Sequence, residues 1–167
     1  LISKGANINS KDNRFRTPLM FACEKRNKEI AELLINNGAN VNDIYKSTYS
    51  ILMFACKNRN KEIVELLIKN GADINYKNKN TISVLMWSCQ KGNIEISKLL
   101  IKNGADVNYK DKYTCSILML SVKNGDREIA ELLINNGAIV NDREKSSYSI
   151  LMYACKNRNK GIAELLI

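Results

Sequence analysis

The sequence predicts an all-α repeat solenoid, a stack of helix–turn–helix units joined by hairpin-like extended turns. Three landmarks support this prediction, because each of them recurs every 33 residues. Gly-Ala begins at Gly5, Gly38, Gly71, Gly104 and Gly137. Leu-Met ends at Met20, Met53, Met86, Met119 and Met152, and Leu-Leu-Ile begins at Leu33, Leu66, Leu99, Leu132 and Leu165. One period held at three landmarks indicates a repeat array, in which each unit buries its apolar face by stacking on its neighbours.

The landmarks divide the chain into units of equal length. Residues 1–10 look like the tail of a preceding unit. Complete units follow at 11–43, 44–76, 77–109 and 110–142, and a partial fifth unit covers 143–167. Neither end shows the polar outer face of a capping repeat, so we expect further units on both sides in the natural protein.

The first helix of the first complete unit is predicted to begin at Thr17-Pro18. Thr17 supplies a hydroxyl N-cap, and Pro18 follows where its missing N–H is not needed. Leu19, Ala22 and Cys23 then form one apolar face. In the later units the predicted caps are Ser50, Ser83, Ser116 and Ser149.

The second helix is predicted over Lys28 to Asn37, where Ile30, Leu33 and Leu34 keep helical spacing. Gly38 is expected to end it in the left-handed conformation. The polar stretch that follows, such as Asn40 to Tyr49, lacks helical periodicity and is predicted to form an extended, hairpin-like connection.

The units resemble the ankyrin repeat family over essentially the whole chain. Residues 17–22, Thr-Pro-Leu-Met-Phe-Ala, are similar to the family's Thr-Pro-Leu-His-x-Ala helix start. Residues 28–42 are similar to its second helix and the following Gly-Ala-Asp-Val-Asn. The resemblance implies an ankyrin-like, slightly curved stack whose hairpin tips and first helices line a concave binding surface. It also implies protein recognition rather than catalysis.

Three positions depart from the family pattern. The motif's His is Met in all five units, so apolar packing replaces a polar pairing. The Gly between the two helices is kept at Gly92 and Gly125 but is Arg26, Arg59 and Arg158 elsewhere. Each Arg costs about 1–2 kcal/mol if that position is left-handed. The Gly of the hairpin tip is replaced by Phe15, Thr48, Thr81, Thr114 and Ser147.

Composition and charge narrow the classes of function. Lys and Arg number 26 against 17 acidic residues, and the resulting charge of +9 favours acidic partners. Histidine is absent, which excludes a Ser-His-Asp triad, a Cys-His pair and a His-ligated zinc site. The longest uncharged stretch, Asn80 to Gln90, is shorter than the about 18–20 residues of a membrane span. We expect no enzyme, no cofactor, no metal and no membrane span.

Cysteine, methionine and asparagine each form a row at one unit position. The Cys row is Cys23, Cys56, Cys89 and Cys155. It lacks C-x-x-C spacing and has Val122 as its fourth copy, so these thiols are predicted to be free and buried. Cys115 lies off register on a hairpin tip and is expected to be the accessible thiol. The five Met are predicted to be core.

The Asn row follows each Gly-Ala: Asn9, Asn42, Asn75, Asn108 and Asn141. Its side chains are expected to bond hairpin backbone. The alternative is hydroxylation, which is reported at the matching Asn of some ankyrin proteins.

One large side chain per unit avoids the core face of the first helix: Phe21, Phe54, Trp87, Leu120 and Tyr153. Such a side chain either lies half-buried between repeats or serves as an anchor, since aromatic residues dominate binding hot spots. Trp87, the only Trp, is the strongest candidate.

The two helices of a unit differ in charge. Eight Glu lie on the second helices, whereas the first helices carry Lys25, Lys57, Lys91, Lys123 and Lys156 against a single Glu24. Hairpin tips add further cations, so on an ankyrin-like layout the concave side is the basic side. The alternative is a solvated surface that only keeps the array soluble.

We predict a non-enzymatic scaffold that binds an acidic protein partner on the concave face. Basic residues would steer the partner and Tyr and Trp would supply contact area. The predicted partner-binding residues are Arg14, Arg16, Lys25, Lys46, Tyr49, Lys57, Lys79, Trp87, Lys91, Lys112, Tyr113, Lys123, Lys145, Tyr148 and Lys156.

Two other functions remain open at this point. The first is binding of phosphate polyanions, either nucleic acid or anionic lipid. No nucleic-acid-binding motif is present, however, and in residues 110–142 acidic residues outnumber basic ones. The second is a regulatory or spacer module of a larger protein with a separate catalytic domain. We also expect a monomer in the cytoplasm, with the nucleus as the alternative location.

Overall fold

The computed structural model describes residues 5–46, 48–143 and 148–167. Within these residues ten α-helices form five consecutive pairs. The first helices of the pairs are α1 (Pro18–Glu24), α3 (Ile51–Lys57), α5 (Val84–Gln90), α7 (Ile117–Asn124) and α9 (Ile150–Lys156). The second helices are α2 (Lys28–Asn36), α4 (Lys61–Lys69), α6 (Ile94–Lys102), α8 (Arg127–Asn135) and α10 (Lys160–Leu166).

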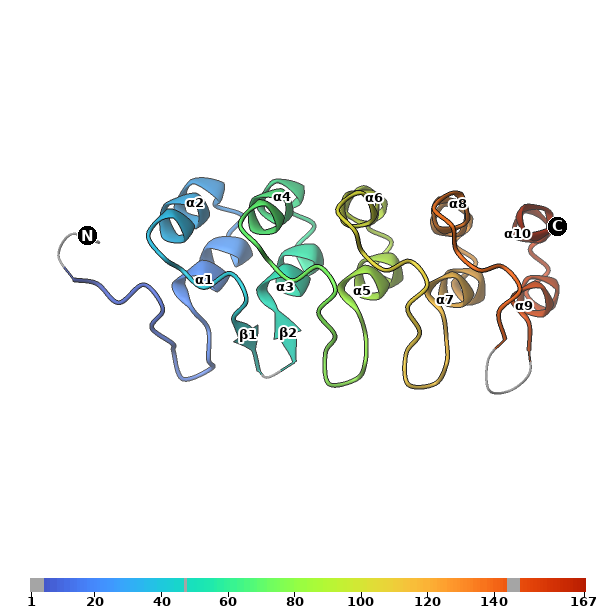
Figure 1. The fold of residues 1–167 in the computed structure, drawn as a ribbon, viewed down its shortest axis with the longest axis horizontal. Helices are drawn as coiled ribbons and strands as arrows, with labels where there is room; N and C mark the ends of the chain where they lie inside the picture. The colour runs from blue at the N-terminus through green and yellow to red at the C-terminus, as the bar shows by residue number, and fades with distance from the viewer. Residues whose placement is uncertain (1–4, 47, 144–147) are drawn as a thin grey trace.

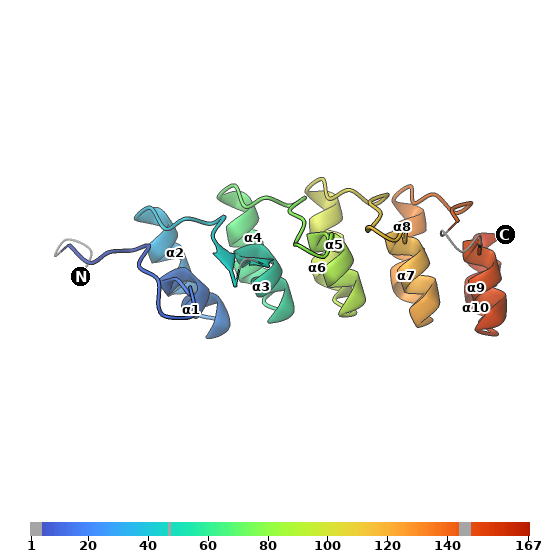
Figure 2. The same cartoon turned by 90° about the horizontal axis from the view of Figure 1, so that it is seen from below.

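The pairs stand in one row, in chain order from the N-terminus to the C-terminus (Figure 1). First helices form one layer and second helices the other, and the turned view shows all of them side by side with similar axes (Figure 2). Each helix packs on its pair partner and on the equivalent helix of the neighbouring pair. The chain is therefore the all-α repeat solenoid of helix–turn–helix units that the sequence predicts.

Hydroxyl side chains begin the first helices, as predicted. Thr17 and the four Ser caps each accept the backbone N–H three residues later, at 3.1 to 3.3 Å. Asn or Asp caps begin most second helices in the same way. The exception is Asn93, whose amide donates to the Cys56 carbonyl at 2.8 Å and so ties the third pair to the second.

The turn between the two helices of a pair passes through the left-handed region. Arg26, Arg59 and Arg158 have φ of 55°, 53° and 54°, close to the 64° of Gly92 at the same position. These three arginines are therefore left-handed, and each one lowers the stability of the fold by about 1–2 kcal/mol relative to Gly.

The core runs without interruption along the interface of the two layers. Four Met of the Leu-Met pairs are buried, as predicted: Met20, Met53, Met86 and Met119. The prediction is wrong for Met152, whose side chain is 51% exposed. Met152 belongs to α9, which among the described helices packs mainly on α7 and α10.

Two predictions about the thiols are also wrong. Cys23, Cys56 and Cys89 are free and buried, but Cys155 is exposed on the uncovered face of the last pair. Cys115 is buried instead of accessible. It directly precedes the cap Ser116, and its Sγ lies 3.7 Å from the Ser116 carbonyl oxygen, so its side chain turns inward at the base of the hairpin.

The connections between pairs are hairpins, as predicted. In one of them β1 (Ile44–Tyr45) pairs antiparallel with β2 (Tyr49–Ser50). Later hairpins close with single bridges, Lys77 to Ser83, Lys110 to Ser116 and Arg143 to Ser149. Of the residues that replace the family's tip Gly, Phe15, Thr81 and Thr114 are left-handed, and in the second unit Lys46 is left-handed. Ser147, expected at the fifth tip, lies outside the described residues.

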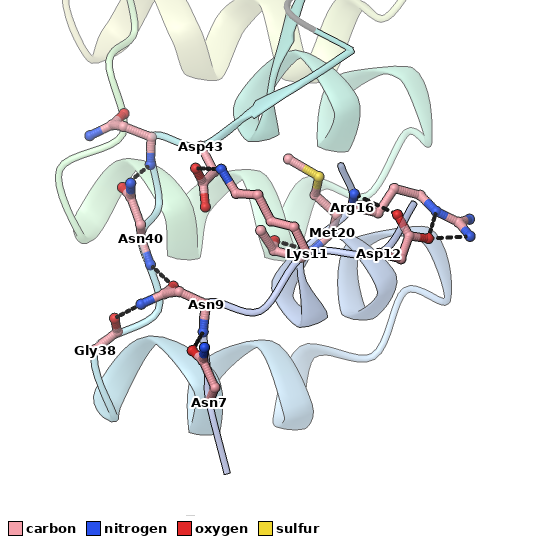
Figure 3. A network of polar contacts seen from close by, with 11 residues as sticks. Asn7, Asn9, Lys11, Asp12, Arg16, Met20, Gly38, Asn40 and Asp43 are labelled. Carbon is pink, nitrogen blue, oxygen red and sulfur yellow. Dashed lines mark hydrogen bonds and ion pairs between the residues drawn. The ribbon is translucent and has the colours of Figure 1, made fainter. Parts of the chain in front are cut away.

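Asparagine side chains link successive repeats, and their expected role is only partly right. Asn9 does bond backbone, but that backbone belongs to the next repeat (Figure 3). Its Nδ2 donates to the Gly38 carbonyl at 3.0 Å, and its Oδ1 accepts the Asn40 N–H at 2.9 Å. Asn42, Asn75 and Asn108 repeat both bonds. The row therefore fixes one repeat against the next.

Candidate functional site

The hairpins and the exposed side of the first helices together form one continuous surface, here called the hairpin face. The hairpins project from the first-helix layer on the side opposite the second helices (Figure 1), and Figure 2 looks onto this face. In α3 five of seven residues are buried, which leaves Phe54 and Lys57 as the side chains outside the core. α1, α5 and α7 likewise leave two or three residues outside the core, whereas α9 of the last described pair buries only Ile150 and Ala154.

Side-chain caps hold the hairpin tips in shape. The Asp12 carboxylate accepts the backbone N–H groups of Arg14 and Arg16, both at 2.8 Å. The Arg16 bond is the main reason why the pKa of Asp12 is lowered. Asn78 and Asp111 make the equivalent pair of bonds in later hairpins. Tyr45 occupies this position in the second unit and offers no such acceptor, although its carbonyl still accepts the Thr48 N–H at 3.0 Å.

Neighbouring hairpins are also tied to each other. Lys11 pairs with Asp43 at 2.8 Å across one repeat (Figure 3). Lys110 pairs with Asp142 at 2.6 Å in the same way. At the same position Lys77 lies over the Tyr109 ring, 4.7 Å from its centroid. Because each hairpin is fixed against the next, the spacing of their side chains is preset.

Aromatic rings from hairpins and helices meet on this face. The Tyr49 and Trp87 ring centroids are 5.3 Å apart, and those of Tyr45 and Phe54 are 5.7 Å apart. Tyr148 and Tyr153 form a third pair at 5.3 Å. The predicted half-buried position is observed for Phe54, Trp87, Leu120 and Tyr153, while Phe21 is 37% exposed. Trp87 Nε1 is buried and has no acceptor among the described residues.

A cation lies over a ring in every repeat. We call this set the basic aromatic row: Arg16 over Phe21, Lys46 over Tyr45, Lys91 over Trp87, Lys112 over Tyr113, Lys123 over Tyr153 and Lys156 over Tyr148. The distances from cation to ring centroid run from 4.2 to 5.6 Å. Such contacts are worth about 0.5–1 kcal/mol at exposed sites, so each holds its side chain loosely on the surface.

Most cations of this face have no acidic partner within the described residues. Arg16 is the exception, because it pairs with Asp12 at 2.8 Å and approaches Glu24 at 3.6 Å. No described carboxylate lies within ion-pair distance of Lys25, Lys46, Lys57, Lys79, Lys91, Lys112 or Lys156. Their charge is therefore available to a ligand.

The predicted partner-binding residues are spread along this face. Ten are exposed: Arg14, Lys25, Lys46, Lys57, Lys79, Lys91, Lys112, Tyr113, Tyr148 and Lys156. Arg16, Tyr49, Trp87 and Lys123 are half-buried. Lys145 lies outside the described residues. The structure brings Tyr49, Trp87 and Lys91 together, and it brings Tyr148 to Lys156.

One member of the row, Tyr45, was missed by sequence reasoning as a contact residue. Tyr45 contacts both Lys46 and Phe54. The signal for Tyr45 was present in the sequence, because other units carry Asp12, Asn78 or Asp111 at that position. A ring in place of a tip cap indicates a surface role.

The chemistry of this face is charge and aromatic contact. No group of three or more potential metal ligands occurs within residues 5–46, 48–143 and 148–167. Burial raises the pKa of the Cys23, Cys56 and Cys89 thiols to about 12, so they are poor nucleophiles at neutral pH. None of the described helices has the length and apolar character needed to cross a membrane.

Comparison with known proteins identifies the repeat. A family model described as ankyrin repeats (3 copies) matches residues 1–78, 52–144 and 85–167. A search of curated proteins gives no match. Ankyrin repeats are generally protein–protein interaction modules and are typically not catalytic. The matches span the whole chain, and the observed stack of capped helix pairs and hairpins agrees with them. The chain belongs to the ankyrin repeat family.

Proposed function

We propose that the protein is a non-enzymatic interaction scaffold that binds an acidic segment of a partner protein along its hairpin face. The observation that supports this most strongly is the set of cations without acidic partners, among them Lys46, Lys91, Lys112 and Lys156, each beside an aromatic ring. Exposed lysines provide steering and register, and adjacent rings provide contact area that a carboxylate-bearing segment can cover.

The second-helix layer offers a poorer surface for such a ligand. One exposed position of this layer carries Glu32, Glu65 and Glu131 in three of the complete units and Lys98 in the remaining one. Some of its lysines are already paired, since Lys98 and Lys61 lie 3.1 and 3.7 Å from Glu95. An acidic segment would meet like charge there, which costs affinity.

A matched pair of charge-reversal variants tests the proposal. Lys57, Lys91 and Lys123 are changed to Glu on the hairpin face, and in the control Lys28, Lys69 and Lys102 are changed to Glu on the second helices. Both variants lose the same net charge. The probe is a fluorescein-labelled 12-residue peptide of alternating Asp and Ser, titrated by anisotropy with helical content checked by circular dichroism.

We expect the hairpin-face variant to bind at least tenfold more weakly than the control, which corresponds to about 1.4 kcal/mol. Equal losses in the two folded variants would mean that net charge alone attracts the peptide, and the proposal would be wrong. A 12-nucleotide oligo-dT that binds more tightly than the peptide, with a steep salt dependence, would instead indicate a phosphate polyanion as the ligand.

A further inference from the structure

We propose that the bound partner segment is a polyproline II helix with an acidic residue at every third position, lying along the repeat axis. This inference rests on the proposed function and specifies the conformation and sequence pattern of the ligand. It follows from the spacing of the cations, from the geometry of extended chains and from an unpaired donor on the hairpin face.

The helix cations repeat at the spacing of packed helices. Successive first helices contact one another from α1 to α9, and packed helices lie about 8–10 Å apart. Lys57, Lys123 and Lys156 occupy one unit position, while Lys25 and Lys91 occupy the next one along the helix. Every repeat therefore presents one helix lysine, and adjacent lysines are separated by about one helix spacing.

Only some backbone conformations place acidic side chains at this interval. In a β-strand, side chains on one face are about 6.6–6.8 Å apart, or twice that for every second one. Neither distance matches the spacing of about 8–10 Å between packed helices. In an α-helix the interval requires acids seven residues apart, about 10.5 Å along the axis. A polyproline II helix has three residues per turn and rises about 9.3 Å per turn. Every third side chain then points to the same side and meets one lysine per repeat.

The hydrogen-bonding groups favour polyproline II over the α-helix. The carbonyl groups of an α-helix are used inside the helix, whereas those of a polyproline II segment are free. Trp87 Nε1 is buried and has no acceptor among the described residues. The ring must therefore turn before this N–H can meet a ligand carbonyl, and that turn breaks no hydrogen bond of the indole. Aromatic faces such as Tyr49 and Trp87 also suit the preformed, low-entropy backbone of this conformation.

Three peptides test the pattern. The first is a 12-residue peptide with four copies of Asp-Pro-Ala, and the second has the same composition with its four Asp placed consecutively. The third is an Ala-rich helical peptide with Asp at every seventh position. Binding is measured by anisotropy of a fluorescein label and by the fluorescence of Trp87, which is the only Trp and so reports this site alone.

We expect the periodic peptide to bind about tenfold more tightly than its clustered isomer and to change the Trp87 emission. Trp87→Phe, which keeps an aromatic ring but removes the N–H, should weaken the periodic peptide several-fold and leave the clustered one nearly unchanged. The Lys57, Lys91 and Lys123 reversal should abolish the preference for the periodic peptide.

The failures of the two proposals are distinguishable. If periodic and clustered peptides bind equally and both are lost in the lysine reversal, the acidic-segment function stands and the three-residue pattern is wrong. Tighter binding of the helical peptide would overturn the polyproline II assignment. If none of the three peptides binds above the oligo-dT control, both proposals are overturned.

Discussion

The two helix layers have the same 33-residue period but differ in how much of each helix is buried. In the first-helix layer α3 buries Ile51, Leu52, Met53, Ala55 and Cys56, so little of the helix reaches the surface. In the second-helix layer α4 buries Ile63, Val64, Leu66 and Leu67 of its nine residues, and α2 of the first pair buries only Ala31. Both layers supply the core, and the second helices keep more of their residues at the surface.

This difference indicates where functional information can lie. In α1, α3, α5 and α7 two or three residues per helix lie outside the core, and they include the variable position of Phe21, Trp87 and Leu120. The second helices repeat nearly the same acidic pattern. Variation at the few exposed positions of the first helices is typical of a recognition surface, whereas uniform polar residues on the second helices serve solubility.

The largest expected effect is a core truncation in the first-helix layer. Leu85 is 1% exposed, so Leu85→Ala should lower the free energy of unfolding by about 2–5 kcal/mol through a cavity. Leu33 in α2 of the first pair is 55% exposed, and Leu33→Ala should cost less than about 1 kcal/mol. Urea denaturation measures both values, and similar losses would contradict the difference in burial between the two positions.

The layers should also respond to opposite ends of the pH range. Burial raises the pKa of the Cys23, Cys56 and Cys89 thiols from 9.0 to about 12. Above pH 9 the unfolded chain loses these protons first, so stability is present below pH 9 and is lost as the pH rises towards 12. At pH 10 the loss should be about 1 kcal/mol per thiol.

Replacing the three Cys by Val, the residue found at Val122, should reduce the loss of stability at alkaline pH. Thermal unfolding of the wild type and the triple Cys→Val variant from pH 8 to pH 10 tests the prediction for the thiols. An equally steep loss of stability with pH in the variant would contradict it.

In the second-helix layer a hydrogen bond from Lys98 lowers the pKa of Glu95. The stability that the ionised Glu95 carboxylate adds to the fold is therefore present above the ordinary Glu pKa and is lost as the pH falls.

The smallest expected effect concerns the turn that joins the layers. Arg26 has φ of 55°, so Arg26→Gly should relieve left-handed strain. The greater freedom of Gly in the unfolded chain offsets part of the gain, which leaves a stabilisation of about 0.5–1 kcal/mol. Gly92→Arg should destabilise by a similar amount. Chemical denaturation of both variants gives the comparison, and destabilisation by Arg26→Gly would show that the arginine contributes contacts outweighing its strain.

Periodicity and capping made most of the fold predictable. Gly, Leu-Met and hydroxyl residues at fixed intervals specify helix ends through local rules, and Thr17 and the four Ser behave accordingly. Side-chain direction was less predictable, because it depends on neighbouring repeats. Cys115 turns inward at a hairpin base, and the Asn9 amide crosses to the next repeat.

The candidate site was predictable as a set of positions but not as a set of contacts. Charge counts placed Lys on the first helices and the hairpins. They did not indicate that Arg16 would be neutralised by Asp12, or that Tyr45 would pack edge to face against Phe54, because both depend on the path of a hairpin.

The indole N–H signal of Trp87 in a ¹H–¹⁵N spectrum offers the most direct test of the hairpin face as the binding surface. With a single Trp, the side-chain signal needs no further assignment. On titration with the Asp-Pro-Ala peptide, we expect this signal and the amides of α5 to shift together, while the amides of α4 and α6 stay in place. Shifts confined to α4 and α6, with the indole signal unchanged at saturation, would contradict the account.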